Sequence, residues 1–173
     1  MDRRKFLHAT TAAAVAGAAA GCTVVNNPFR SLSLEEAATL QALCGWIIPE
    51  DTAPGARQAG VVNYIDRQLA RKFREYRETY RNGLAAAVHL AGGCYAAAPP
   101  ERQLAILRRM EQAPETRRFV DLVVTHSMQG FYGNPRHGGN RDFVSWRMLE
   151  IPLVPFRGRN PYDFANGGRR AES

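Results

Sequence analysis

Apolar residues recur every three or four positions over most of residues 33–128, which is the spacing of one face of an α-helix. Ser33 and Glu36 have the spacing of a capping box, so we expect the first helix to begin there and to end before Pro49. The apolar face of this helix consists of Leu40, Leu43, Cys44, Ile47 and Ile48. The segment from Pro49 to Gly60 contains two prolines and two acids, and it is predicted to be a loop.

A second apolar series predicts one amphipathic helix of about twenty residues. The series consists of Val62, Ile65, Leu69, Phe73, Tyr76 and Tyr80. The opposite side of this helix is rich in arginine. It is predicted either to contact a partner or to be a solvated face with weak ion pairs between neighbouring turns.

Proline and glycine mark the ends of the remaining helices. Residues 84–90 extend or restart a helix that Gly92 ends, and Pro100 suits the first position of the next helix. Residues 115–128 are predicted to form the last long helix, with Gly130 as its C-terminal cap. No alternating run of apolar and polar residues demands a sheet. The sequence therefore predicts an all-α fold, a small bundle of four to five helices.

The composition changes after the last long helix. From Gly130 to Asn140, seven of eleven residues are Gly, Asn or Pro, which predicts tight turns and positive φ angles. A short helical turn is expected from Asp142 to Met148, followed by an extended tail over residues 153–173 that wraps a partner or is loose. Aromatic residues and arginines alternate in this loop, and such side chains suit a contact surface. We predict that a partner binds to Gln129, Phe131, Tyr132, Arg136, His137, Arg141, Trp146 and Arg147.

The same stretch carries a family resemblance. His126-Ser-Met-Gln-Gly-Phe-Tyr-Gly-Asn-Pro-Arg-His-Gly-Gly-Asn-Arg-Asp, followed by Trp146-Arg-Met-Leu-Glu-Ile-Pro, resembles the pattern of the gluconate 2-dehydrogenase subunit 3 family. These proteins are the small (gamma) subunits of membrane-bound dehydrogenases that act on sugars and sugar acids. This sequence departs from the pattern at two positions: His137 stands where the family often has Tyr, and Glu150 where it often has Gly.

The resemblance implies a division of labour between subunits. In that family a large FAD-containing subunit performs the oxidation, often together with a multi-haem cytochrome c subunit. The small subunit is thought to assist maturation and export. The resemblance thus implies that FAD, and haem c where present, belong to partner subunits, and that this chain has no catalytic, cofactor-binding or metal-binding residues. It does not name the substrate, because gluconate, glucose, fructose and other polyols are oxidised by enzymes of this plan.

The N-terminus predicts export. Arg3 and Arg4 stand in a twin-arginine pattern before an Ala-rich segment, so residues 1–21 are expected to be a signal peptide for the twin-arginine translocase and to direct the chain to the periplasm. Twelve helical residues reach only ~18 Å, too short for a ~30 Å hydrocarbon core. Small residues before Cys22 resemble a lipoprotein processing site, which makes Cys22 a lipidation candidate; ordinary cleavage nearby, or no cleavage, is the alternative. Residues 22–32 then form a tether, and residues 33–152 the small-subunit domain.

The net charge and the cysteines limit which kinds of partner and bound metal are expected. The formal net charge is +7, which suits an anionic membrane surface or an acidic protein, whereas export argues against nucleic acid. The membrane would be reached through a partner or through the lipid. Cys44 lies on an apolar helix face, where it is expected to be buried; pairing with Cys94 in an oxidising periplasm is the alternative. No Cys-x-x-Cys motif supports zinc or c-type haem.

The sequence gives little support for a catalytic site in this chain. Glu50 and Asp51 are adjacent acids in a loop, which are more often solvated than catalytic. His126 and Ser127 are neighbours on a helix and cannot face each other, so a nucleophile–base pair with Asp142 as orienter fails. His126 is instead expected near the helix end, where it holds the turn through loop carbonyls or the helix dipole. No glycine motif of the dinucleotide or phosphate-loop type occurs.

Two hypotheses of different class follow. The first is an exported, non-catalytic subunit that docks a flavin dehydrogenase through residues 126–148 and supports its maturation, translocation or anchoring. The second is a free-standing periplasmic enzyme, or a small-molecule-binding lipoprotein, with a pocket beneath that loop.

Overall fold

Helices dominate the computed structural model, which describes residues 26–151 together with 162–163 and 169–170. The α-helices are α1 (Leu34–Ile47), α2 (Val61–Leu69), α3 (Arg77–Ala91), α4 (Pro100–Gln112), α5 (Pro114–Tyr132) and α6 (Val144–Met148). Short 3-10 helices are η1 (Arg74–Tyr76), η2 (Tyr95–Ala97), η3 (Pro135–His137) and η4 (Arg141–Phe143). The strands β1 (Tyr162–Asp163) and β2 (Arg169–Arg170) form a small antiparallel pair. The predicted all-α bundle is confirmed, with α6 as a short additional helix.

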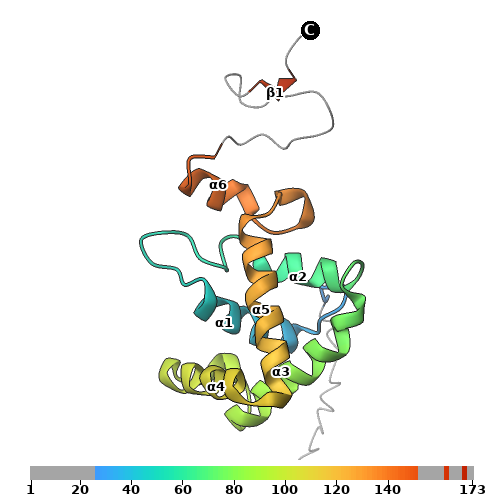
Figure 1. Ribbon diagram of the computed structural model, residues 1–173, viewed down its shortest axis with the longest axis vertical. Coiled ribbons are helices and arrows are strands. Elements are labelled where there is room, and N and C mark those ends of the chain that lie inside the picture. Colours follow the sequence, from blue (N-terminus) through green and yellow to red (C-terminus); the bar gives the residue numbers. More distant parts are fainter. Residues whose placement is uncertain (1–25, 152–161, 164–168, 171–173) are drawn as a thin grey trace, which may run out of the picture.

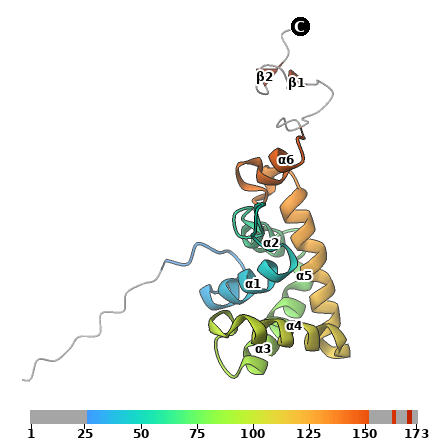
Figure 2. The same cartoon turned by 90° about the vertical axis from the view of Figure 1, so that its left-hand side faces the viewer.

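The helix α5 organises the bundle. It contacts α1, α2, α3 and α4, and these helices all lie on one side of it (Figures 1 and 2). In Figure 2, α5 runs along one edge of the molecule, and no other helix lies beyond it. The helix α4 packs near the N-terminal end of α5, whereas α6 lies at its C-terminal end. One face of α5 is therefore left uncovered by the bundle.

The first helix has the predicted capping box. The Ser33 hydroxyl accepts a hydrogen bond from the Glu36 backbone N–H at 3.1 Å, and the Glu36 carboxylate accepts one from the Ser33 N–H at 2.7 Å. These bonds satisfy two backbone donors that every helix start leaves free. The predicted apolar face packs into the bundle, where Leu40, Leu43 and Cys44 are buried.

The prediction of one long helix over residues 62–80 is wrong, because the chain breaks between Leu69 and Arg77. The Arg77 Nε donates to the carbonyl oxygen of Leu69 at 2.7 Å, and this bond satisfies an acceptor at the open end of α2. The break allows Phe73 and Tyr76 to turn toward α5, where both rings pack near His126. The apolar residues keep the same three- and four-residue spacing on both sides of the break, so the pattern did not reveal it.

A glycine sets the closest approach of α3 to α5. A Cβ atom added to Gly83 would lie 2.1 Å from Cγ of Phe119, far inside normal contact. The Phe119 ring is fully buried there and meets the Tyr80 ring edge-on at 5.5 Å. Only glycine allows the two helices to pack at this distance.

The last long helix extends further than predicted. The helix α5 continues to Tyr132, so Gly130 is a buried residue inside the helix and not its cap; Gly133 follows the helix instead. In the described part of the chain, no helix is both long and apolar enough to cross a membrane. The predicted signal peptide (residues 1–21), Cys22 and most of the predicted tail (153–173) lie outside the described residues.

Candidate functional site

Buried polar side chains hold the C-terminal segment against the end of α5. We refer to residues 133–151 as the cap. The Asn140 amide nitrogen donates to the carbonyl oxygen of Gly133 at 3.0 Å, and its amide oxygen accepts from the Ser145 N–H at 3.0 Å. The Ser145 hydroxyl donates to the carbonyl oxygen of Phe131 at 2.6 Å. Asn140 and Ser145 are both fully buried, so these bonds fix the cap to the bundle.

The cap contains an unusual density of left-handed backbone. Asn140, Asp142 and Phe143 have φ angles of 43°, 55° and 57°. Residues other than glycine seldom adopt this region, and each costs on the order of 1–3 kcal/mol. Glu150 also lies there, with a φ of 54°, at the position where the resemblance leads one to expect glycine. The surrounding contacts must therefore supply enough free energy to hold a strained segment.

Positive φ angles were predicted for residues 130–140 and are found there at Gly138 and Asn140; those of Asp142, Phe143 and Glu150 lie beyond the predicted stretch. Gly139 serves a close approach instead, because a Cβ atom there would lie 2.1 Å from the carbonyl oxygen of Gly130 in α5. The loop can thus lie directly on the last turn of the helix. Asn140 and Ser145 were not predicted as structural residues. The only sequence signal for Asn140 is that Asn tolerates left-handed backbone better than other residues with a side chain.

Trp146 joins α6 to the end of α5. Its indole Nε1 donates to the carbonyl oxygen of Tyr132 at 2.8 Å, and its own carbonyl accepts from the Ile151 N–H at 2.7 Å. The Phe143 ring lies 5.6 Å from the indole ring. Trp146 is half-buried, so it both supports the cap and contributes to its surface.

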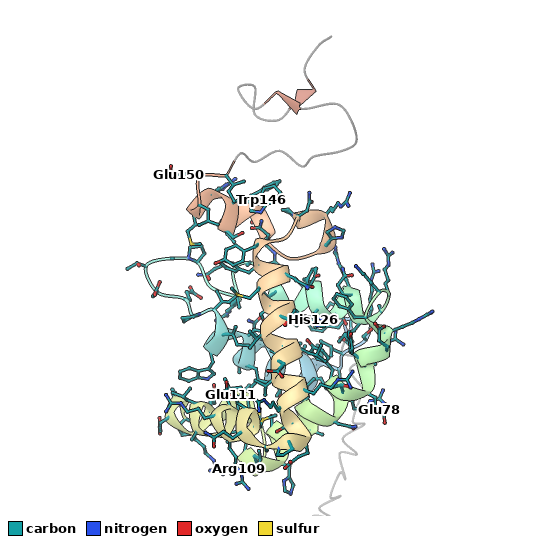
Figure 3. All side chains as sticks on the ribbon, viewed as in Figure 1. Glu78, Arg109, Glu111, His126, Trp146 and Glu150 are labelled. Carbon is teal, nitrogen blue, oxygen red and sulfur yellow. The ribbon has the colours of Figure 1, made fainter. Side chains whose placement is uncertain are left out.

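Exposed apolar side chains gather at this end of the molecule. Of the seven large apolar residues that are exposed in the described chain, all except Leu34 lie on the uncovered face of α5 or in the cap. We name these six residues the apolar end surface: Val124, Met128, Tyr132, Met148, Leu149 and Ile151. The first three are spaced by four residues and lie on one face of α5. Figure 3 shows Trp146 and Glu150 at the same end of the bundle.

The predicted partner-binding residues separate into groups. Tyr132 belongs to the apolar end surface, and Gln129 and Arg147 are exposed next to Met128 and Met148 in the chain. The Gln129 amide oxygen accepts from the Tyr64 hydroxyl at 3.0 Å. Phe131 is a correction: it is only 1% exposed and belongs to the buried core, although it follows the exposed Val124 by seven residues, about two turns of α5. It can support a surface from below but cannot contact a partner.

The basic residues of the prediction lie elsewhere on the cap. The Arg141 N–H donates to the carbonyl oxygen of Ala59 at 3.0 Å, so Arg141 is placed beside the loop that precedes α2. Arg136 and His137 form η3, which contacts α2. The residues predicted as one surface therefore belong to an apolar part and to separate basic parts.

His126 is part of the core and not of the helix end, which corrects the prediction that it holds the turn. It lies within an aromatic core cluster that we define as Phe73, Tyr76, Tyr80, Phe119 and His126. The imidazole stacks on the Phe73 ring at 4.3 Å, and its Nδ1 is hydrogen-bonded to the Tyr80 hydroxyl at 2.9 Å. Burial lowers the pKa of His126, against the opposing charge of Glu75, and burial raises the pKa of Tyr80 well above its usual range. Both groups are therefore kept neutral.

Ser127 and Cys44, the other reactive side chains near His126, are also buried in the core and hydrogen-bonded to each other. The Ser127 hydroxyl is fully buried and donates to Sγ of Cys44 at 3.3 Å. Burial raises the pKa of the Cys44 thiol to about 12, so it is not a thiolate at neutral pH. Cys44 is buried as predicted, Cys94 is exposed, and both are free thiols, so the alternative pairing is not formed. Within the described residues, no cluster of three or more His, Cys, Asp or Glu side chains could hold a metal ion.

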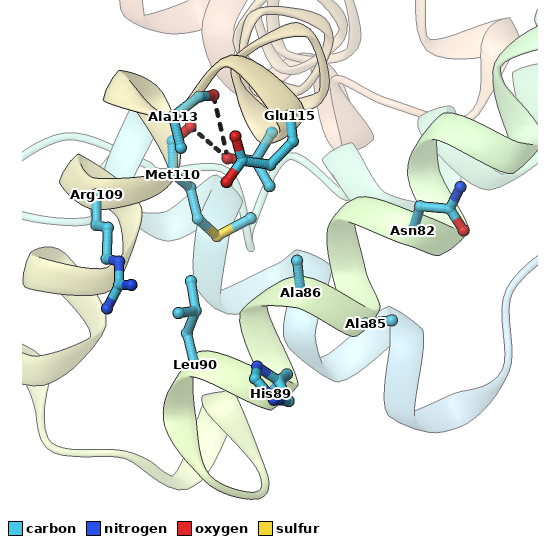
Figure 4. Close-up of a pocket in the computed structure, with 10 residues that line it drawn as sticks. Asn82, Ala85, Ala86, His89, Leu90, Arg109, Met110, Ala113 and Glu115 are labelled. Atoms are coloured by element: carbon cyan, nitrogen blue, oxygen red, sulfur yellow. Dashed lines mark hydrogen bonds between the residues drawn. The ribbon is translucent and has the colours of Figure 1, made fainter.

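A groove of about 460 Å³ lies between α3 and α4, at the opposite end from the cap (Figure 4). Leu90, Met110 and several alanines give it largely apolar walls, with His89 and Arg109 at its sides. The Thr116 hydroxyl, which also lines it, donates to the carbonyl oxygen of Met110 at 2.6 Å and is satisfied within the fold. A second hollow of about 390 Å³ adjoins Arg141. Neither hollow brings a nucleophile and a base together.

Comparison with known proteins agrees with the resemblance. The sequence model of the family described as Gluconate 2-dehydrogenase subunit 3 matches residues 34–152, more than half of the chain. This match begins with the first residue of α1 and extends one residue beyond the cap. Searches of curated proteins and of solved structures gave no match. The family name implies a subunit of a multi-subunit gluconate dehydrogenase. By this match, the chain belongs to the gluconate 2-dehydrogenase subunit 3 family.

Proposed function

We propose that this chain is the non-catalytic small subunit of a membrane-associated, FAD-dependent dehydrogenase of the gluconate 2-dehydrogenase type. In this proposal it docks the large flavoprotein subunit through the apolar end surface and supports its maturation and export. The flavoprotein supplies FAD and performs the oxidation of a sugar or sugar acid. A cytochrome c subunit, where the complex has one, carries the electrons onward.

The observation that carries this proposal is the apolar end surface. Met148, Leu149 and Ile151 are 39%, 49% and 41% exposed in the cap, which contacts the C-terminal end of α5, and Met128 and Tyr132 are exposed on the last two turns of that helix. Monomeric soluble proteins rarely expose large groups of neighbouring apolar side chains, and such groups mark sites where another protein or a membrane binds. Gln129 and Arg147 lie beside them and provide the polar rim that such interfaces usually have.

The rigidity of the cap also favours a docking role. Asn140 and Ser145 fix its backbone to the end of α5 through buried or partly buried hydrogen bonds, and Trp146 adds an exposed one to the Tyr132 carbonyl oxygen. A surface that is already ordered loses less conformational entropy when a partner binds. The backbone strain at Asp142 and Phe143 is consistent with a segment whose shape is constrained by function.

The use of reactive residues within the core supports a non-catalytic role. His126, Ser127 and Cys44 are buried and hydrogen-bonded to other core groups, so none of them can meet a substrate without a change in the fold. Chemistry in the complex is then assigned to the partner subunits, and this chain contributes contacts and shape.

The export role rests on the sequence, because Arg3, Arg4 and Cys22 lie outside the described residues. The twin-arginine translocase carries folded proteins, so one signal peptide can serve a complex that assembles beforehand. A flavoprotein bound to the cap would reach the periplasm with this chain. Lipidation of Cys22 would then add hydrophobic anchoring of about 0.8 kcal/mol per buried CH₂ group.

A charge placed in the apolar end surface tests the docking. Leu149→Asp should abolish co-purification of the flavoprotein from membranes, since an unpaired carboxylate would be desolvated in the interface. Leu34→Asp is the matched control, because Leu34 is also an exposed leucine, 41% exposed, but belongs to α1 and not to the apolar end surface. Mass spectrometry identifies what is retained. Equal retention by both variants would contradict the proposed docking site.

The alternative function, a free-standing enzyme or small-molecule-binding lipoprotein, has its own test. The purified chain should not oxidise gluconate or other polyols with an artificial electron acceptor, and it should carry no flavin absorbance. Activity or bound flavin in the single chain would overturn the proposed non-catalytic role.

A further inference from the structure

Basic side chains from three separate segments line one small hollow. It has a volume of about 180 Å³ and is lined by Arg30, Arg67, Gln68, Arg71, Arg136 and His137, which we name the cationic hollow. Arg30 precedes α1, the next three residues belong to α2 or follow it directly, and the last two form part of η3. The fold brings them together because η3 lies against α2 (Figure 1). Among the described residues, none that lines the hollow carries a carboxylate.

The segment that carries Arg30 is fixed by a buried acid. The Asp66 carboxylate, only 3% exposed, accepts hydrogen bonds from the backbone N–H groups of Arg30, Ser31 and Leu32 at 2.7–3.2 Å. Because these backbone donors occupy the carboxylate, it holds the chain in place and does not pair with the guanidinium groups of the hollow. The position of Arg30 is thus set by the fold.

Gly138 gives Arg67 its position. A Cβ atom added to Gly138 would lie 2.7 Å from Cδ and 3.0 Å from Nε of Arg67, so the arginine side chain crosses directly over this glycine. Gly138 also has a φ of 102°, which disfavours any side chain there. The glycine therefore leaves room for the Arg67 side chain, which lines the hollow together with Arg136 and His137.

The hollow has a positive electrostatic environment. The Arg136 Nε donates to Nε2 of His137 at 3.0 Å, which makes that imidazole nitrogen an acceptor. Partial burial lowers the pKa of His137, and the positive charges of Arg136 and Lys72 lower it further. Several positively charged groups are thus held close together. A bound anion would reduce the electrostatic repulsion between them.

We propose that the cationic hollow binds a phosphate group, provided by a lipid headgroup or by a soluble phosphate ester. Four guanidinium groups from three segments line the hollow, and a phosphate offers them tetrahedrally arranged oxygens, three free in a monoester and two in a lipid phosphodiester, whereas a carboxylate offers two in one plane. The hollow is small and polar, which suits a single phosphate and not an extended apolar ligand. This site is separate from the apolar end surface and does not depend on the proposed docking.

The test compares two double variants of the full-length chain, both carrying Cys22→Ser so that acylation cannot contribute to membrane binding. Arg67→Gln/Arg71→Gln removes two exposed arginines of the hollow. Arg108→Gln/Arg117→Gln removes the same charge from exposed positions on α4 and α5, outside the hollow. Far-UV circular dichroism and thermal unfolding should be alike for both, since all four residues are exposed.

Inorganic phosphate is the first probe, and it is followed by the imidazole signals of His137 in NMR spectra. Phosphate should shift these signals saturably and raise the pKa of His137 in the control variant, and the hollow variant should bind about tenfold more weakly or worse. Vesicles of phosphatidylglycerol and of phosphatidylcholine are the second probe. Sedimentation only with the anionic vesicles, lost in the hollow variant, identifies a lipid source; phosphate binding without vesicle binding identifies a soluble one.

Two outcomes would overturn the phosphate site. One is that neither phosphate nor anionic vesicles distinguish the hollow variant from the control variant. The other is that polyglutamate, which carries only carboxylates, binds more tightly than phosphate and depends on the same two arginines. That result would assign the hollow to an acidic protein segment instead.

Discussion

The aromatic core cluster and the cap each contain a histidine, and the two regions use it differently. His126 stacks between Phe73 and Tyr80 and is 3% exposed, with its ring nitrogen bonded to a buried hydroxyl. His137 is exposed in the cationic hollow, with an arginine as its hydrogen-bond partner. The pKa of both is lowered, but nearby positive charges contribute only at His137. The core therefore uses His126 to stabilise the fold, whereas the cap leaves His137 accessible to other molecules.

This difference between core and cap predicts whether a substitution will change the free energy of unfolding or the binding of a partner. Changes in the aromatic core cluster should alter the free energy of unfolding and affect partner binding only through it. Changes on the exposed side of the cap should alter binding with little effect on unfolding, because exposed residues seldom contribute more than about 0.5 kcal/mol. Residues that hold the cap to α5 should affect both.

The largest effect is expected at the contact of α3 with α5. Gly83→Val should lower the free energy of unfolding by about 3 kcal/mol, because its side chain would overlap the Phe119 ring, already 2.1 Å from an added Cβ. Chemical denaturation provides the measurement. Gly45→Ala is the matched control: no atom lies within 4 Å of a Cβ added there, so alanine should raise stability by about 1 kcal/mol or less. A tolerated valine at residue 83 would contradict the packing of these helices.

A smaller effect is expected where the cap meets the helix. Asn140→Ala should lower the free energy of unfolding by about 2 kcal/mol, because it leaves the buried Ser145 N–H unpaired and places alanine in left-handed backbone. Hydrogen exchange at the Ser145 amide should increase as well. Asn134→Ala, at an exposed bond to the Arg136 N–H, should cost no more than about 1 kcal/mol. Equal costs at the two positions would show that the cap is not fixed through Asn140.

The smallest effect is a pH dependence that separates the two histidines. Folding lowers the pKa of His126, so the unfolded chain binds the proton more readily; stability is complete above the ordinary pKa of about 6.5 and decreases as the pH falls below it. The slope should not exceed about 1.4 kcal/mol per pH unit. His126→Phe should flatten the curve between pH 6.5 and 5; His137→Gln should flatten it less, because His137 is exposed and solvent screens the charges that lower its pKa. The reverse result would exchange the roles assigned to the two residues.

Much of the helical framework follows from local sequence signals. The capping box at Ser33, the glycine at position 92 and the proline at position 100 each mark a helix end correctly. The loop after α5 was also predicted at about the right place, because a concentration of Gly, Asn and Pro between helices is a local property of the chain. The family resemblance carried by residues 126–152 is confirmed.

What local signals missed depends on contacts between distant residues. The break after Leu69 lies in an unchanged apolar period and exists because Phe73 and Tyr76 pack against α5. Gly130 resembled a helix cap, but it lies inside α5, where an added Cβ atom would lie 3.0 Å from Cδ1 of Tyr64 in α2. Phe131 resembled its exposed neighbour Tyr132, and only the orientation of α5 shows that one ring is buried. Asn140 has partners on both sides of the loop, which no spacing rule reveals.

The most direct measurement of the central claim is hydrogen–deuterium exchange on the chain alone and in complex with its flavoprotein. If the apolar end surface is the docking site, peptides covering residues 124–132 and 144–151 should gain protection in the complex. Peptides of α4, at the opposite end, should exchange at the same rate in both states. Protection confined to the groove between α3 and α4, with none in the cap, would contradict the account.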